Sequence, residues 1–579
     1  MRLTGPALAP VRCNTINEAL ARAAQTQAGL TLVDSREHET FIGFSELYSS
    51  ARRVAAGLIE RGVSAGDRVA VVLPTGRDFL DAFFGAQLAG AVPVPLYPPV
   101  RLGRMNEYVQ STARMMKAVQ AKVVISDRRV KLLLGKAIDL ARPELGCPTV
   151  ADLVASNAAA EREVTGESIG VIQFSSGSTV DPKPVALTQA NLVAQVTALE
   201  QLMGPGNVGV SWLPLYHDMG LIGCLLSAVY QAGHLVLLPP EVFLAKPALW
   251  LRAISRHRAT VSPAPNFAYG LCLKRLQDED LVGVDLSSWK MALNGAEPVS
   301  PETIDKFTHR FAAFGFRRQA LMPVYGLSEA SLAVTFTSPD QEKRVVNIDA
   351  MTLASRGEVR PGSRGLVSVG TPVPGADVEV RSDDGELVSE RQVGRIFTRG
   401  ASVMAGYFGN TEATARTLRG GWLDTGDLGF VQEGELFVCG RAKDVVIIRG
   451  ANHAPQEFEE CLEDVRGVRT GCAVAVGFVP DDANDEQLLM LVERSNESAN
   501  DVAENVSAVV NARTGIKPHT VVLLEPGTLP RTSSGKLRRL ESLKRYLANT
   551  LEAPEQVNAL TMGREIAKSV MGHAKALLR

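Results

Sequence analysis

A cluster of hydroxyl residues around one glycine is the part of this chain best suited to binding a polyanion. Residues 172–187 read I-Q-F-S-S-G-S-T-V-D-P-K-P-V-A-L, so a short apolar run leads into the cluster. Backbone N–H groups, several hydroxyls and one ammonium suit a triphosphate, because its charge is spread over many oxygens. The pattern predicts a strand that runs into a polyanion-binding loop. The candidate ligands are Ser175, Ser176, Gly177, Ser178, Thr179 and Lys183.

The same composition also fits a plain connection between two regular elements. No Gly-Lys-Ser/Thr follows Gly177, so the stretch does not match G-x-x-x-x-G-K-[ST] and a Walker-type NTPase is disfavoured. The chemistry therefore depends on what the rest of the chain supplies.

Composition and charge limit the possible partners. The 579 residues include 61 basic and 63 acidic side chains, so a net charge of −2 gives no general attraction to nucleic acid or to an anionic membrane. Seven scattered cysteines without a C-x-x-C motif argue against a disulfide scaffold and a zinc cluster. No secretory apolar run opens the chain, and polar residues interrupt the apolar stretch from Met219 to Pro240. We expect a cytoplasmic protein without nucleic-acid partners or integral membrane association.

The order of apolar patterns predicts an α/β protein of two domains. Unbroken Val/Ile runs such as 68–73 and 123–126 alternate with helical patterns, which is typical of parallel sheets covered on both faces. From about residue 365 to 439 the segments become antiparallel and β-rich. We expect doubly wound mixed or parallel sheets plus this β-rich subdomain in residues 1–439. Residues 440–579 should form a small mobile α+β domain that ends in a helix from Gln556 to Leu578.

Eight motifs in order resemble the adenylate-forming superfamily, and some look specifically like its fatty acyl-AMP ligase branch. Q-F-S-S-G-S-T-V-D-P-K is similar to the superfamily's phosphate loop, and W-L-P-L-Y-H-D-M-G-L-I-G (212–223) and A-P-N-F-A-Y-G-L-C (264–272) resemble the branch. One motif would be weak, but eight over most of the chain make coincidence improbable. The others are N-G-A-E-P (294–298), Y-G-L-S-E (325–329), W-L-D-T-G-D-L-G (422–429), G-R-A-K-D (440–444) and P-R-T-S-S-G-K-L-R-R (530–539).

The resemblance implies that ATP and a medium- or long-chain fatty acid give an acyl-adenylate and pyrophosphate. The acyl group would then pass to the phosphopantetheine thiol of an acyl carrier protein. The attacking carboxylate is ionised at neutral pH, so positioning and cations matter more than a general base. Lys183 and the loop hydroxyls would hold the β- and γ-phosphates, and Glu329 with Thr179 would ligate Mg²⁺. Lys536 would contact the carboxylate and the α-phosphate, and His217 would orient the carboxylate.

Further roles follow from the same resemblance. Asp427 would accept the ribose hydroxyls with Arg441 nearby, and Lys443 would serve as the hinge. Each of these residues also has a plainer interpretation: a solvated charge, an Asx turn or an ordinary core position. The adenine site would include Gly295, Ala296, Glu297, Tyr325, Gly326 and Ser328, and the acyl pocket Met219, Phe267, Ala268 and Tyr269.

The polar stretch from about 337 to 362 looks like the insertion of the acyl-AMP ligase branch, which is thought to hinder the domain rotation needed for CoA. Taken as physics alone, it is a long surface loop with short elements of its own. Val180 and Pro184 depart from the superfamily's phosphate loop, where glycines are usual. An acyl-CoA ligase and a nucleotide-binding relative without turnover therefore stay as alternatives.

Overall fold

The chain is described here from a computed structural model. The structure describes residues 1–99, 102–154, 158–175, 182–339, 341–463, 465–480, 485–495, 500–532, 535–554 and Ser569. Most of the predicted phosphate loop, Ser176 to Thr179, lies outside the described residues. Apart from Ser569, so does the helix predicted over Gln556–Leu578.

A small parallel sheet forms the first layer of the large N-terminal part. Its order is β5-β4-β6, and both pairings are parallel. These strands are the Val/Ile runs of the sequence, and their side chains are buried on both faces because helices cover them. The strands are β4 (Arg68–Val72), β5 (Val92–Pro95) and β6 (Val123–Ser126), and the helices are α2 (Phe44–Glu60), α3 (Arg77–Leu88), α4 (Met105–Ala118) and α5 (Arg128–Ala141).

A nine-stranded sheet carries the middle of the chain, in the order β17-β14-β13-β12-β11-β9-β10-β2-β3. The strands from β13 to β2 run parallel. The flanking strands are antiparallel, and they are β17 (Thr371–Pro372), β14 (Ala333–Phe336) and β3 (Glu39–Gly43). Ligands of such sheets bind where the carboxyl ends of parallel strands meet. The parallel strands are β2 (Gly29–Val33), β10 (His234–Leu237), β9 (Val208–Ser211), β11 (Val261–Ala264), β12 (Met291–Asn294) and β13 (Leu321–Gly326), with α7 (Gln189–Met203) on one face.

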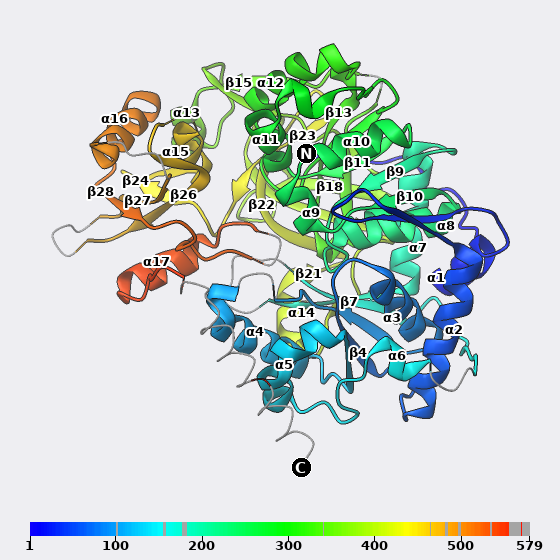
Figure 1. Cartoon of the computed structure of the whole chain (residues 1–579). Coiled ribbons are helices and arrows are strands. Elements are labelled where there is room, and N and C mark those ends of the chain that lie inside the picture. The colour runs from blue at the N-terminus through cyan, green and yellow to red at the C-terminus, as the bar shows by residue number, and fades with distance from the viewer. Residues whose placement is uncertain are drawn as a thin grey trace.

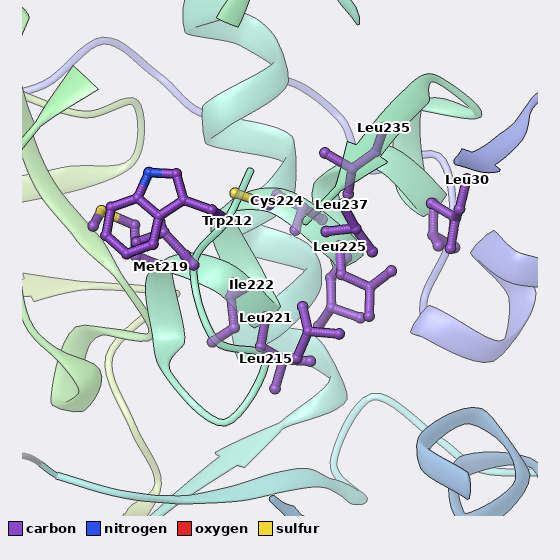
Figure 2. Packing of buried hydrophobic residues seen from close by; sticks show 14 of the residues in the cluster. Leu30, Trp212, Leu215, Met219, Leu221, Ile222, Cys224, Leu225, Leu235 and Leu237 are labelled. Atoms are coloured by element: carbon purple, nitrogen blue, oxygen red, sulfur yellow. The ribbon is translucent and has the colours of Figure 1, made fainter. Parts of the chain in front are cut away.

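The longest apolar stretch of the sequence is buried, as predicted, in a helix followed by a strand. A π-helix over Met219–Leu226 continues directly into α8 (Ser227–Gln231) and then into β10. Figure 2 shows Leu221 and Leu225 of this helix in the apolar core with Leu235 and Leu237 of β10. No helix among the described residues is long and apolar enough to cross a membrane.

The predicted β-rich part is an antiparallel sheet. Strands β18 (Ala376–Arg381), β19 (Gly394–Gly400), β22 (Trp422–Gln432) and β23 (Glu435–Arg441) pair in this order. A short strand, β8 (Pro184–Thr188), pairs with β7 (Ile169–Phe174) in a separate three-stranded sheet that leads to the phosphate loop.

The insertion-like stretch is more than a surface loop. It contains β15 (Val345–Ile348) and α13 (Ala350–Arg356), as its short elements predict. Ile348 and Leu353 are buried in a cluster with Phe430 and Phe437 of the β-rich sheet, whose rings stack 4.9 Å apart. The predicted short elements are present, and part of the stretch is buried rather than on the surface because apolar residues recur among its charges.

The C-terminal unit, which we define as the residues that follow β23, has its own apolar core. Two buried clusters in this unit draw only on residues from Val446 onward. Its elements α15, α16 and α17 lie together on the left of Figure 1. Helix α17 follows the Lys536 motif and was not predicted. The elements include β24 (Val446–Ile448), β25 (Ala451–His453), α15 (Gln456–Glu459), β26 (Val468–Phe478), β27 (Gln487–Arg494), α16 (Val502–Thr514), β28 (Thr520–Leu524) and α17 (Arg539–Leu547).

An ion pair and hydrogen bonds hold this unit against the large part. Arg545 of α17 lies 2.8 Å from Glu107 of α4. The Arg104 guanidinium donates hydrogen bonds to the carbonyls of Gly527 and Thr528. The C-terminal unit therefore packs directly against the large part. The domain boundary at residue 440 stays a prediction.

Candidate active site

A cavity of about 730 Å³ lies where the parallel sheet, the β-rich sheet and the C-terminal unit meet. The carboxyl ends of β12 and β13 open into it, as expected for an open α/β sheet. Motifs that are far apart in the sequence thus share one wall. The predicted residues that line it are Ser175, Lys183, His217, Met219, Ala296, Tyr325, Gly326, Ser328, Glu329, Arg441, Lys443 and Lys536.

Lys183 stands at the phosphate end of the cavity. The Ser175 N–H donates a 2.9 Å hydrogen bond to the Lys183 carbonyl, which joins the two arms of the loop. The Lys183 ammonium lies 4.5 Å from the centre of the Tyr407 ring. Burial and the neighbouring Lys443 lower the pKa of Lys183, against the opposing effect of Glu329. An arriving polyanion would relieve this repulsion between cations.

Glu329 faces the same space from a short turn after β13. The Tyr407 hydroxyl donates a 2.9 Å hydrogen bond to its Oε1, and burial raises the pKa of the carboxyl. Among the described residues, no group of three His, Cys, Asp or Glu side chains could hold a metal. A hard carboxylate of this kind fits Mg²⁺ only together with phosphate oxygens and water. Thr179, the other predicted ligand, lies outside the described residues.

Asp427 connects the two sheets just behind the cavity wall. The register of β22 and β23 pairs it with Arg441, whose Nε lies 3.4 Å from its Oδ1. The Tyr325 hydroxyl donates a 2.7 Å hydrogen bond to its Oδ2. Burial raises the pKa of Asp427 although Arg441 and this hydrogen bond oppose the rise. The predicted ribose and adenine residues are therefore in contact.

Lys536 reaches the cavity from the C-terminal unit. Its backbone N–H donates to the Thr532 hydroxyl at 3.0 Å, within a turn closed by bridge pairing of Arg531 with Leu537. Burial and Arg441 lower the pKa of Lys536, whereas Asp218, Glu297 and Asp427 counteract them. The ammonium thus lies within the field of groups that belong to the large part of the chain.

A missed residue, Asp218, completes the opposite wall. His217 Nδ1 lies 2.7 Å from Asp218 Oδ1, and the Ser328 hydroxyl donates a 2.5 Å hydrogen bond to Asp218 Oδ2. Burial would raise the pKa of Asp218, but His217 and Ser328 outweigh it and hold the pKa well below the ordinary value. The H-D dipeptide was the available signal. Tyr407, also missed, had none, because only the fold brings it to Glu329.

Of the residues predicted for the acyl pocket, one lines the cavity and three do not. Met219 lines the cavity, but Tyr269 packs in the aromatic core beside Trp250 and Phe307. Ala268 is fully buried on the same helix, α11 (Asn266–Arg275). Phe267 is 41% exposed. None of these three residues is among those that line the cavity, because the helix turns them toward core or solvent. Their place in an acyl pocket stays a prediction.

The residues predicted to bind adenine lie at the cavity wall or directly behind it. Ala296 lines the cavity with a φ of 68°, and Gly295 approaches Val324 so closely that a Cβ would lie 2.7 Å from its carbonyl oxygen. Glu297 accepts a 2.6 Å hydrogen bond from the Phe267 N–H. Within the described residues, Gly295 and Glu297 support the wall without lining it. Lys443, the predicted hinge, lines the wall, and its hinge role stays a prediction.

Comparison with known proteins identifies the family. A family model described as AMP-binding enzyme matches residues 20–408. The chain belongs to this AMP-binding enzyme family. Its fold is that of the adenylate-forming enzymes, and the predicted fatty acyl-AMP ligase branch is confirmed.

Individual relatives of this AMP-binding enzyme carry related names. A putative acyl-CoA synthetase of Caulobacter vibrioides is 36% identical over 93% of this chain and 96% of its own length. The medium-chain-fatty-acid–[acyl-carrier-protein] ligase JamA of Moorena producens is 33% identical over 88% of this chain and 90% of its own. A solved structure from work on fatty acyl-adenylate ligases of E. coli and L. pneumophila has a TM-score of 0.87 at 33% identity, covering 93% of this chain and 99% of the other.

Proposed function

We propose that this chain is a cytoplasmic fatty acyl-AMP ligase that passes its acyl group to the phosphopantetheine thiol of an acyl carrier protein. The observation that carries the proposal is the position of Lys536. It lines one cavity with Lys183, Glu329 and Arg441, and apolar residues such as Val210, Val261 and Leu293 line the same cavity. A polyanion site joined to an apolar site suits a fatty carboxylate that must meet ATP.

The first reaction needs charge control. The fatty carboxylate attacks the α-phosphorus of ATP, a new P–O bond forms, and the bond to pyrophosphate breaks. Both partners are anions, so the cations Lys183 and Lys536 on either side would neutralise the developing charge. His217, held by Asp218 at 2.7 Å, would orient the carboxylate. Mg²⁺, held by Glu329 and phosphate oxygens, would supply further charge neutralisation when bound.

The choice of acceptor rests on the contacts between the insertion-like stretch and the C-terminal unit. The insertion-like stretch contacts the C-terminal unit, because α13 packs beside β25. Arg364, which follows the stretch, lies 2.8 Å from Glu457 of the C-terminal unit, and both side chains are largely buried. These contacts favour a unit that resists rotation, and JamA is named for a carrier-protein acceptor. The name of the Caulobacter relative keeps an acyl-CoA ligase as the second candidate.

A relative without turnover is less well supported. Pro184 is the first residue of β8, a position where a missing N–H is tolerated. Its carbonyl still accepts a 2.8 Å hydrogen bond from Phe408. Pro184 therefore fits the sheet, whereas Val180 lies outside the described residues.

Pyrophosphate release tests the proposal directly. The purified chain with ATP, Mg²⁺ and a fatty acid should release pyrophosphate in a manner dependent on the fatty acid. Adding phosphopantetheinylated carrier protein should give an acylated carrier, and CoA in its place should give little thioester. No pyrophosphate with any fatty acid would refute the activation step, and efficient acyl-CoA formation would refute the acceptor.

A further inference from the structure

The far end of the cavity is polar, although its middle is apolar. One face of the continuous helix from Met219 to Gln231 lines the cavity along its length. Gly223 and Ala228 keep partial exposure in a helix that is otherwise mostly buried, because they face this space. The lining residues of the helix are Met219, Gly223, Cys224, Ser227, Ala228 and Gln231.

The polar end lies at the amino ends of the parallel strands, whereas the nucleotide residues lie at their carboxyl ends. Gln231 ends α8, Asn207 precedes β9, and His234 begins β10, so all three stand near the amino ends of parallel strands. In Figure 1, α8 and β10 lie on the right of the molecule, and the C-terminal unit that carries Lys536 lies on the left. A chain whose carboxylate meets Lys536 would therefore send its other end toward Gln231.

Gln231 is the side chain at this end that has hydrogen bonds to offer. The Asn207 amide already donates to the carbonyls of Met203 and Gly204. His234 lies 3.4 Å from the Thr31 hydroxyl through its Nε2 and stacks beside Phe41. The Gln231 amide makes no hydrogen bond within the described part of the chain. Burial and the neighbouring His257 lower the pKa of His234, against the opposing effect of Glu39. The described residues that we place at this end, Asn207, Gln231 and His234, include no Lys or Arg that could pair with a second carboxylate.

We propose that the cavity selects acyl chains whose remote end carries a neutral hydrogen-bonding group such as a hydroxyl, with Gln231 as the specificity-determining residue. The inference rests on the proposed function and refines its substrate class. The length of the acyl chain decides whether a terminal hydroxyl weakens or strengthens binding. A hydroxyl on a short chain stops among apolar residues such as Leu235 and Val261 and loses hydration without a partner. On an acyl chain long enough to reach Gln231, the hydroxyl gains a hydrogen-bond partner.

The test compares saturated fatty acids with their ω-hydroxy counterparts of equal length. For short chains, kcat/KM should be about tenfold or more lower for the ω-hydroxy acid than for the saturated acid. For the longest chains accepted, kcat/KM should be about fivefold higher for the ω-hydroxy acid than for the saturated acid. Gln231→Leu should abolish the gain at the long end, whereas Gln25→Leu, at an exposed position outside the cavity wall, should leave the whole profile unchanged.

Calorimetric binding of the same fatty acids separates this inference from the proposed function. A crossover in affinity without pyrophosphate release would refute the activation step and support the role of Gln231. Activation with a ratio that stays flat or falls with length, or a profile unchanged in Gln231→Leu, would overturn the inference and leave the proposed function standing.

Discussion

The Tyr325 hydroxyl, at the end of a parallel strand, donates a 2.7 Å hydrogen bond to Asp427 on the antiparallel sheet. Two sheets that are far apart in the sequence therefore meet through one side-chain contact at the nucleotide end of the cavity. Arg441 lies on the other side of the same carboxylate. Ribose binding would have to use an acceptor that Tyr325 and Arg441 already hold in place.

Asp427→Asn should raise the KM for ATP by about tenfold or more, because hydrogen bonds to a charged acceptor are worth about 1.5–3 kcal/mol. Tyr325→Phe should have a smaller effect, since the carboxylate remains. Steady-state rates at saturating fatty acid give both values. An unchanged KM in Asp427→Asn would remove this residue from the nucleotide site.

Lys536→Ala should lower the rate of acyl-adenylate formation by about 10²–10³-fold, the usual loss for one preorganised charge at a reacting centre. Pyrophosphate release measures it. Lys544→Ala, on the exposed side of α17, is the matched control and should keep the full rate. Equal losses in both variants would mean that the C-terminal unit, and not the ammonium, had been disturbed.

The alkaline limit of activity should lie below the ordinary range of lysine. Burial and Arg441 lower the pKa of Lys536 from 10.5. The ammonium exists below its pKa, so the rate should fall as the pH rises through this lowered value. The pH profile of kcat/KM reports the free enzyme. Lys536→Arg should lose this limb, because a guanidinium stays protonated; an identical limb in that variant would assign it to another group.

Glu329→Gln should stabilise the ligand-free protein at neutral pH while weakening its use of Mg²⁺. Burial raises the pKa of Glu329 above 4.5. A carboxyl whose pKa is higher in the folded than in the unfolded state does not destabilise the protein at a pH below its unfolded-state pKa. At a pH above its folded-state pKa, it destabilises the protein to the full extent. The Tm advantage of the variant should therefore vanish as the pH falls toward 4.5. The Mg²⁺ requirement should rise about tenfold or more. A Tm gap that is constant with pH would contradict the argument.

Deleting residues 341–362 should destabilise the protein, because it removes the buried Ile348, Leu353 and Val359 from their cluster with Phe430. Each such side chain contributes about 1.5–3 kcal/mol. Thermal unfolding measures the loss. A deletion is therefore a poor test of CoA exclusion.

Arg364→Gln is a cleaner test, because it breaks the contact with Glu457 and leaves the cluster intact. It should increase acyl-CoA formation if the C-terminal unit is held by this pair. Arg360→Gln, on an exposed arginine, should not. No increase in either variant would place the block to CoA elsewhere.

The sequence by itself determined the family and the alternation of helices with buried strands, although it did not predict helix α17. Unbroken Val/Ile runs such as 68–73 predicted buried parallel strands, because only a sheet covered on both faces removes polar residues from both sides. The ordered motifs assigned Lys183, Glu329 and Lys536 to one chemistry.

Only the tertiary structure decided which side chains meet. Asp218 and Tyr407 joined the site through contacts with Ser328 and Glu329 that no local pattern encodes. Tyr269 packs beside Trp250 and does not line the cavity, because the side of a helix that faces a cavity depends on how the helix packs, and core and cavity walls use the same apolar residues. The polar far end at Gln231 likewise follows from the length and direction of the cavity. Local sequence fixes chemistry and periodicity, but the distance between remote segments is set by packing.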